Sequence, residues 1–177
     1  MHRSSKAVAL AILMAVAFSF GPVWAQRGDD AERLSKNGKI QAVIDGIEVT
    51  VEYGRPSIKN RKIWGGLVPY DRIWRTGADE ATTVVVAADV LVEGQALPAG
   101  LYSLFTIPGE EDWIMVFNTV SEQWGAFNYD ESKDALRFTV TPRPADFVES
   151  LEFQIEGSDI VMRWGELAVP VRISAVQ

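Results

Sequence analysis

Apolar and polar side chains alternate along most of the chain beyond residue 39. Apolar residues hold every second position from 47 to 53, and the same period returns over residues 136–141 and 151–156. Successive side chains of a β-strand point to opposite faces, so this period predicts strands with one buried and one exposed face. No long stretch has a helical period, and one short helix is expected near residues 132–135.

Turn signals separate these strands at regular intervals. Asp45-Gly46 stands between two β-rich segments, and Gly supplies the positive φ that a tight hairpin needs. Residues 113–117 are apolar on both faces, which indicates a central strand. Gly165-Glu166 separates two further alternating segments and predicts a closing hairpin. We therefore expect an all-β fold: an antiparallel sandwich or flattened barrel of about eight or nine short strands, forming one domain over residues 39–177.

One long segment, residues 55–81, lacks this alternation. Prolines and glycines are spread through it, together with Trp64, Trp74 and several aliphatic residues. A long irregular loop inside a compact domain is usually either functional or disordered. Its large apolar side chains argue against disorder. We expect an ordered loop, rich in Arg and Trp.

The same loop resembles a known family of exported bacterial proteins, catalogued as domain of unknown function 2911. The matching words are RPS at 55–57, RKIWGGLVPY at 61–70, IWRTGADEAT at 73–82, LPAG at 97–100, YSLFTIP at 102–108, Trp113, FN at 117–118, QWG at 123–125 and KDALR at 133–137. The resemblance spans residues 51–153 and departs at Asp79, where the family usually carries Asn. It implies export and a compact β-rich domain, and it implies no activity.

The first 25 residues have the layout of a secretory signal peptide. A short basic start precedes an apolar run over residues 7–20, and small residues at Val23 and Ala25 mark a cleavage site before Gln26. The apolar run is shorter than the roughly 20 residues of a spanning helix, which disfavours the alternative of an uncleaved anchor. We expect an exported protein, periplasmic or secreted. It should have a flexible lead-in at residues 26–38 and no membrane span after cleavage.

Cleavage makes the protein strongly acidic and leaves it without two reactive side chains. Removal of Arg3 and Lys6 from 17 basic residues leaves 15 against 24 acidic residues, a net charge of −9. An acidic surface disfavours nucleic acid as a partner. The only histidine is His2, and there is no cysteine. Residues 26–177 therefore lack the groups for Ser-His-Asp or Cys-His catalysis, thiol redox chemistry, and zinc or copper sites. We expect no cofactor and no metal.

Positive charge is concentrated in the irregular loop. Residues 55–75 contain six basic residues and one acidic residue, a net charge of +5, whereas residues 76–177 contain five basic and 17 acidic residues, a net charge of −12. Such segregation attracts anions, and an Arg side chain holds a carboxylate or phosphate through two hydrogen bonds. The alternative is that these arginines pair with the acidic remainder and fasten the loop to the sandwich.

The aromatic and acidic side chains outside the strands can also be interpreted in two ways, as parts of a functional site or as structural contacts. Tryptophans there provide either a flat platform for a sugar ring or a plug for the open end of a sandwich. The pairs Asp79-Glu80 and Asp130-Glu131 are candidates for the acid and base of a glycan hydrolase, although carboxylates on loops are usually solvated or ion-paired. The predicted ligand-binding residues are Arg55, Arg61, Trp64, Trp74, Arg75, Glu80 and Trp124.

Together these patterns predict an exported, non-catalytic module of the cell envelope, either binding or structural. Its expected ligand is a small anion or a glycan, held on the loop of residues 55–80. A carboxylate-based glycan hydrolase is the alternative function, and a purely structural envelope module is a third interpretation. Convergence of the loop residues on a concave pocket favours binding or catalysis, whereas burial with each arginine paired to its own carboxylate favours structure.

Overall fold

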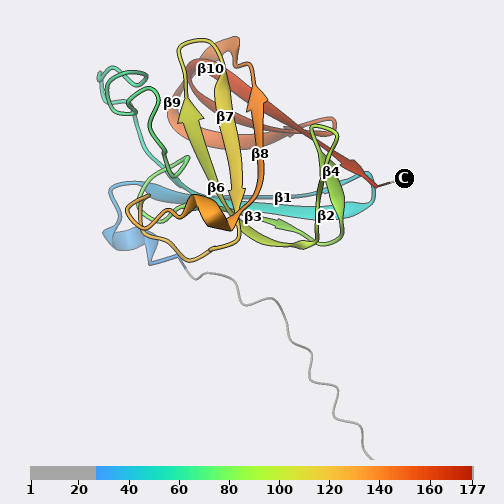
Figure 1. Ribbon diagram of the computed structural model, residues 1–177. Coiled ribbons are helices and arrows are strands. Elements are labelled where there is room, and N and C mark those ends of the chain that lie inside the picture. The colour runs from blue at the N-terminus through green and yellow to red at the C-terminus, as the bar shows by residue number, and fades with distance from the viewer. Residues whose placement is uncertain (1–26, 177) are drawn as a thin grey trace, which may run out of the picture.

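A computed structural model describes residues 27–176, and these residues form two packed antiparallel sheets (Figure 1). Two single-turn 3-10 helices, η1 (Asp30–Glu32) and η2 (Glu131–Lys133), are the helices of this part of the chain. The second lies where the sequence predicts a short helix. The strands are β1 (Lys36–Ile44), β2 (Ile47–Arg55), β3 (Thr82–Val86), β4 (Val90–Val92), β5 (Gln95–Leu97), β6 (Gly100–Pro108), β7 (Trp113–Asn118), β8 (Asp134–Val140), β9 (Arg143–Glu156) and β10 (Asp159–Ala175).

The sheets have six and four strands, in the orders β1-β2-β3-β6-β7-β8 and β5-β4-β10-β9. The fold is therefore the expected all-β sandwich. It is not the flattened barrel, because the two sheets do not close on each other. The ten described strands exceed the eight or nine expected. The central position predicted for residues 113–117 is confirmed, since β7 lies between β6 and β8.

Of the two hairpin turns predicted at Asp45-Gly46 and Gly165-Glu166, the structure contains the first and not the second. Asp45 and Gly46 both have positive φ and join β1 to β2, as the Asp-Gly signal predicts. The hairpin expected at Gly165-Glu166 is wrong, because β10 runs continuously through Gly165 and is bulged there against β9. Gly165 has a φ of 63°, and a Cβ at this position would lie 2.9 Å from Ile63 Cδ1. A glycine followed by a polar residue marks a bulge as readily as a turn.

Four tryptophans close the core beneath the long loop. Trp64 and Trp74 come from the loop, Trp113 from β7 and Trp164 from β10. The Trp64 ring centroid lies 4.6 Å from that of Trp113 and 5.7 Å from that of Trp164. Trp74 stacks on Trp164 at 6.0 Å, and its indole N–H donates to Gly77 O. The loop tryptophans Trp64 and Trp74 thus close the end of the sandwich, which is one of the two roles that the sequence suggests for them.

The N-terminal boundary differs from the expected one. β1 begins at Lys36, so residues 36–38 of the predicted lead-in belong to the first strand, and η1 lies within the same segment. The predicted signal peptide and its cleavage site lie outside the described residues. Among residues 27–176, no helix is long and apolar enough to cross a membrane.

Candidate functional site

Backbone hydrogen bonds hold the long loop against both sheets. Near its start, Ile58 N donates to Glu149 O of β9 at 3.0 Å. In its middle, Trp74 N donates to Thr106 O of β6 at 2.8 Å. Its last residues exchange hydrogen bonds with residues 123–125. The loop is therefore ordered, as its composition predicts, and it is held in place by main-chain hydrogen bonds and by the packing of its two half-buried tryptophans against the core.

The end of this loop carries backbone strain. Thr76 is fully buried and has a φ of 54°, and Asp79 has a φ of 62°. A positive φ is rare for a β-branched residue, whereas Asp and Asn tolerate it through short local hydrogen bonds. Strained residues of this kind tend to gather at functional sites.

The seven predicted site residues do not converge on one pocket. Arg55 bonds to β9, where its Nε donates to Leu151 O at 3.2 Å, and Trp74 is part of the core plug. Arg61 and Trp64 line one surface groove. The remaining three, Arg75, Glu80 and Trp124, lie in the region where the end of the loop meets residues 123–125.

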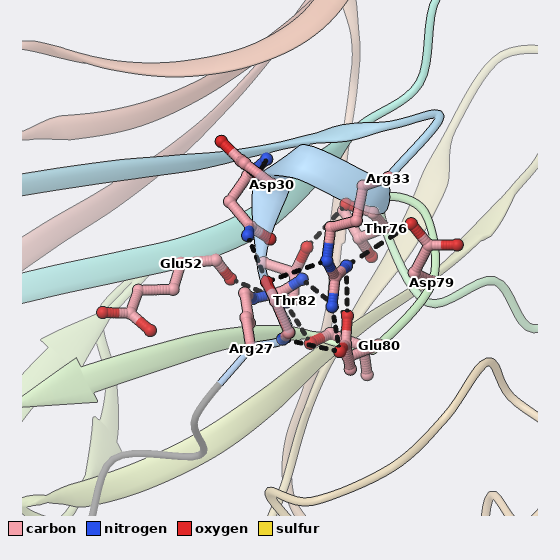
Figure 2. Close-up of polar contacts among 11 residues, drawn as sticks. Arg27, Asp30, Arg33, Glu52, Thr76, Asp79, Glu80 and Thr82 are labelled. Atoms are coloured by element: carbon pink, nitrogen blue, oxygen red, sulfur yellow. Dashed lines mark hydrogen bonds and ion pairs between the residues drawn. The ribbon is translucent and has the colours of Figure 1, made fainter.

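Two arginines of the N-terminal segment surround Glu80 (Figure 2). Arg33 forms a bidentate ion pair with the Glu80 carboxylate, and its Nη1 lies 3.4 Å from Asp79 Oδ2. Arg27 Nη1 lies 3.6 Å from Glu80 Oε2, while its Nη2 donates to the carbonyl oxygens of Ala81 and Glu52. The arginine side chains are only 7% and 9% exposed. Glu80 therefore fastens the N-terminal segment to the end of the loop.

Burial and pairing act on the pKa values of this cluster in opposite directions. Burial alone would raise the pKa of Glu80, but hydrogen bonds from Arg33 and from backbone amides outweigh it and lower the pKa. Burial lowers the pKa of Arg27, against the charge of Glu80. The hydrogen bond to Glu80 raises the pKa of Arg33. Glu80 is held as a carboxylate, which is the opposite of what a general acid requires.

A small pocket opens beside this cluster, and we call it the Trp124 pocket. It has a volume of about 270 Å³ and is lined by Arg27, Glu80, Ala81, Thr83, Ser121, Glu122, Gln123 and Trp124. The Trp124 side chain is 60% exposed, so its ring forms an open edge. Two polar atoms of the lining residues, Arg27 Nη1 and Gln123 Oε1, are buried without a hydrogen-bond partner within residues 27–176.

A larger groove is lined by residues of the long loop and of strands β9 and β10, and we call it the basic groove. Its volume is about 600 Å³, and its lining residues are Ile58, Arg61, Lys62, Ile63, Trp64, Tyr70, Phe147, Gly165, Glu166 and Leu167. Most of these side chains are apolar or aromatic, and Phe147 is 61% exposed. Arg61 and Lys62 supply two positive charges. The loop that carries them projects from the sandwich in Figure 1, where it is drawn in teal and green.

Most cations of the loop have no carboxylate partner. Arg55 has one, since its Nη2 lies 3.8 Å from Glu152 Oε2. Within residues 27–176, no carboxylate lies at ion-pair distance from the other basic side chains of residues 55–75. Those side chains are Lys59, Arg61, Lys62, Arg72 and Arg75. The idea that the arginines fasten the loop by pairing with acidic residues therefore holds for Arg55 alone.

Arg75 is the most constrained of these unpaired cations. It is half-buried, and its Nε is covered without a hydrogen-bond partner among the described residues. Burial lowers its pKa, and the charge of Asp79 compensates only in part. Its guanidinium approaches the position of Gly125, next to Trp124. Half-burial of a charge without an ion pair costs stability.

The other predicted acidic pair has structural contacts. Asp130 caps η2 by accepting from Ser132 N at 2.9 Å, and Glu131 forms an ion pair with Arg137. Neither lines the Trp124 pocket or the basic groove. Within residues 27–176, no cluster of acidic side chains is arranged to hold a metal ion.

Sequence reasoning missed Arg27, Arg33 and Phe147. The two arginines lie in a polar segment without periodicity, which gave no sign that it packs on the domain. Phe147 stands in the first half of β9, where residues 143–150 do not alternate. Its closeness to Arg61 depends on the pairing of loop and strand, and Ser57 does form an isolated bridge with Ser150.

Comparison with known proteins agrees with this architecture. Residues 35–173 match the family described as "Protein of unknown function (DUF2911)". No curated protein and no solved structure matches the chain. The matched range includes strands of both sheets, the long loop and the segment that carries Trp124. It also contains every sequence motif on which the family resemblance rests. The chain therefore belongs to the DUF2911 family of proteins of unknown function.

Proposed function

We propose that this protein is an exported, non-catalytic binding module whose ligand carries an anionic group and binds in the basic groove. The observation that carries the proposal is the set of unpaired cations. A domain with 24 acidic residues leaves Arg61 and Lys62 without a carboxylate partner in residues 27–176, on the wall of a groove. Unpaired positive charge inside a negative surface focuses anions toward that point.

The groove also prepares Arg61 for binding. Arg61 Nε donates to Ile58 O at 2.9 Å, and Nη2 donates to Ser57 O at 2.8 Å. These two bonds orient the guanidinium and leave Nη1 without a bond to any described residue. A donor that is already oriented loses less side-chain entropy when a ligand binds. Arg61 is therefore suited to a carboxylate or phosphate oxygen.

The remaining lining indicates what accompanies the charge. Trp64 and Tyr70 are half-buried, and Phe147 is largely exposed. Ligand sites are typically apolar surfaces with a few placed polar groups. An anion attached to a ring or short apolar body therefore fits the groove better than a free inorganic ion does.

The groove does not favour the alternative of glycan hydrolysis. Such hydrolysis uses two carboxyl groups that flank the scissile bond, about 5–10 Å apart. Glu166 is the single carboxylate among the residues that line the groove. Glu80, the acidic residue predicted for a site, is occupied by Arg27 and Arg33. Non-catalytic binding is the function that these contacts support.

Calorimetric titration tests the proposal with phenyl phosphate, inorganic phosphate and phenol. We expect phenyl phosphate to bind most tightly, because it combines charge and ring. The variant Arg61→Ala/Lys62→Ala should lose this binding. The matched control, Lys59→Ala/Arg72→Ala, removes the same charge from the same loop outside the groove lining and should retain it. Equal loss in both variants, or no saturable binding to the parent, would overturn the proposal.

A further inference from the structure

We propose that the Trp124 pocket is a second binding site, separate from the basic groove, and that it takes a neutral sugar ring. The pocket lies at the other end of the long loop, where Arg27 and Glu80 are among its lining residues. Figure 2 shows the polar contacts of these two residues with Arg33. It shares no lining residue with the basic groove. Its polar atoms, its charge and its exposed ring define the ligand independently of the anion proposal.

One buried donor and one buried acceptor among the lining residues have no hydrogen-bond partner within residues 27–176, and the donor, Arg27 Nη1, has only the longer ion-pair contact with Glu80 at 3.6 Å. The Arg27 side chain is 7% exposed, and its Nη1 makes no hydrogen bond within residues 27–176. Gln123 is also 7% exposed, and its Oε1 has no partner in the same residues. The orientation of the Gln123 amide follows from its surroundings, because Nε2 donates to Val120 O at 2.8 Å. A buried polar group without a partner is costly, so a ligand that supplies the missing bonds gains affinity.

Hydroxyl groups suit this pair of atoms. A hydroxyl both donates and accepts, so a polyol with neighbouring hydroxyls can accept from Arg27 and donate to Gln123. Thr83 and Ser121 line the same pocket, and neither side-chain hydroxyl bonds to residues 27–176. The pocket therefore presents several hydrogen-bonding groups of both kinds within a small volume.

The charge of the pocket argues for a neutral ligand. Glu80 and Glu122 both line it, and Arg27 is the single cation among its lining residues. Arg27 is already close to Glu80. A carboxylate or phosphate on the ligand would meet two carboxylates with one compensated cation, and like charges at close range oppose binding. The basic groove and the Trp124 pocket thus select ligands of opposite electrostatic character.

The Trp124 ring supplies the apolar part of the site. It is 60% exposed and pairs through its backbone with Glu80 at the pocket edge. The apolar face of a sugar ring packs against an aromatic face of this kind. The volume of about 270 Å³ lies just under the range of roughly 300–1,000 Å³ typical of drug-sized ligands, which matches a single ring.

Sugar titration of the full mature chain tests the site by intrinsic tryptophan fluorescence and calorimetry. The probes are glucose, N-acetylglucosamine and glucuronate, the last being a sugar ring with a carboxylate. We expect a neutral sugar to bind saturably and glucuronate to bind more weakly. Trp124→Ala should weaken the neutral sugar about tenfold, and Trp124→Phe should restore part of the loss. Thr83→Val, which removes a hydroxyl at similar volume, should weaken it several-fold.

Two controls separate this site from its neighbours. Phe127→Ala removes an 85% exposed aromatic side chain of the same segment that does not line the pocket, and it should leave sugar binding unchanged. Arg61→Ala/Lys62→Ala should abolish phenyl phosphate binding and preserve sugar binding. The proposal fails if no neutral sugar binds, if glucuronate binds more tightly than glucose, or if Trp124→Ala retains full affinity.

Discussion

Replacement of Glu80 tests whether its ion pairs hold the N-terminal segment on the domain. Glu80→Ala leaves the buried side chains of Arg27 and Arg33 without their main counter-charge. Removal of one partner from a buried ion pair typically costs about 3–5 kcal/mol. Asp79 still lies 3.4 Å from Arg33, and the Glu80 side chain is 27% exposed. We therefore expect the lower end of that range, about 3 kcal/mol.

The milder variant Glu80→Gln separates charge from shape. Its amide oxygen still accepts a hydrogen bond, so the expected loss is about 2 kcal/mol, the difference between charged and neutral partners. Glu156→Gln is the matched control, because it breaks the ion pair of Arg143 with Glu156, whose side chains are 50% and 41% exposed. An exposed pair contributes less than about 1 kcal/mol.

Urea unfolding monitored by tryptophan fluorescence measures these free energies. The pKa of Glu80 is below its ordinary value of 4.5 in the folded protein. Its contribution is therefore complete above about pH 4.5 and is lost as pH falls through the lowered folded value. The difference between parent and Glu80→Gln should be constant from neutral pH down to about pH 5 and should shrink below that. A loss no larger than that of Glu156→Gln, or a difference that persists undiminished at about pH 3, would refute the reasoning.

Three further predictions concern the loop, the bulge and the N-terminus. Arg75→Ala should change the free energy of unfolding by less than about 1 kcal/mol, because lost packing of its stem is offset by relief of a half-buried, unpaired charge; a loss above roughly 2 kcal/mol in urea unfolding would show an ion-pair partner. Gly165→Ala should destabilise by about 1–2 kcal/mol, since φ is positive there and the added methyl meets Ile63; an unchanged urea midpoint would contradict this. Mass spectrometry of protein from the cell envelope should find an N-terminus near Gln26; full-length chain in the membrane fraction would speak against cleavage.

Local sequence patterns were sufficient to predict the strands and turns whose structure depends on only a few neighbouring residues. Alternation places one face of strands such as β2 and β8 in the core, and the turn at Asp45-Gly46 needs only its own positive φ values. The predicted fold class and the central strand at residues 113–117 rest on such signals. The tryptophans of the loop also predict from sequence alone that the loop packs against the domain, because the burial of large apolar rings is favourable. Trp64 and Trp74 are partly buried and pack against the core.

Tertiary structure decided everything that depends on pairs of distant residues. Gly165 carries the same local signal for a bulge as for a turn, and only the packing of Ile63 against it distinguishes them. The ion-pair partners of Glu80, Arg27 and Arg33, are distant from it in sequence and lie in the N-terminal segment. No sequence pattern there predicts their contact with Glu80. Arg55 has a carboxylate neighbour and Arg61 has none within residues 27–176, although the two look alike in sequence. Charge pairing depends on distances of a few ångströms across the fold, and those distances are set by sheet packing rather than by sequence spacing.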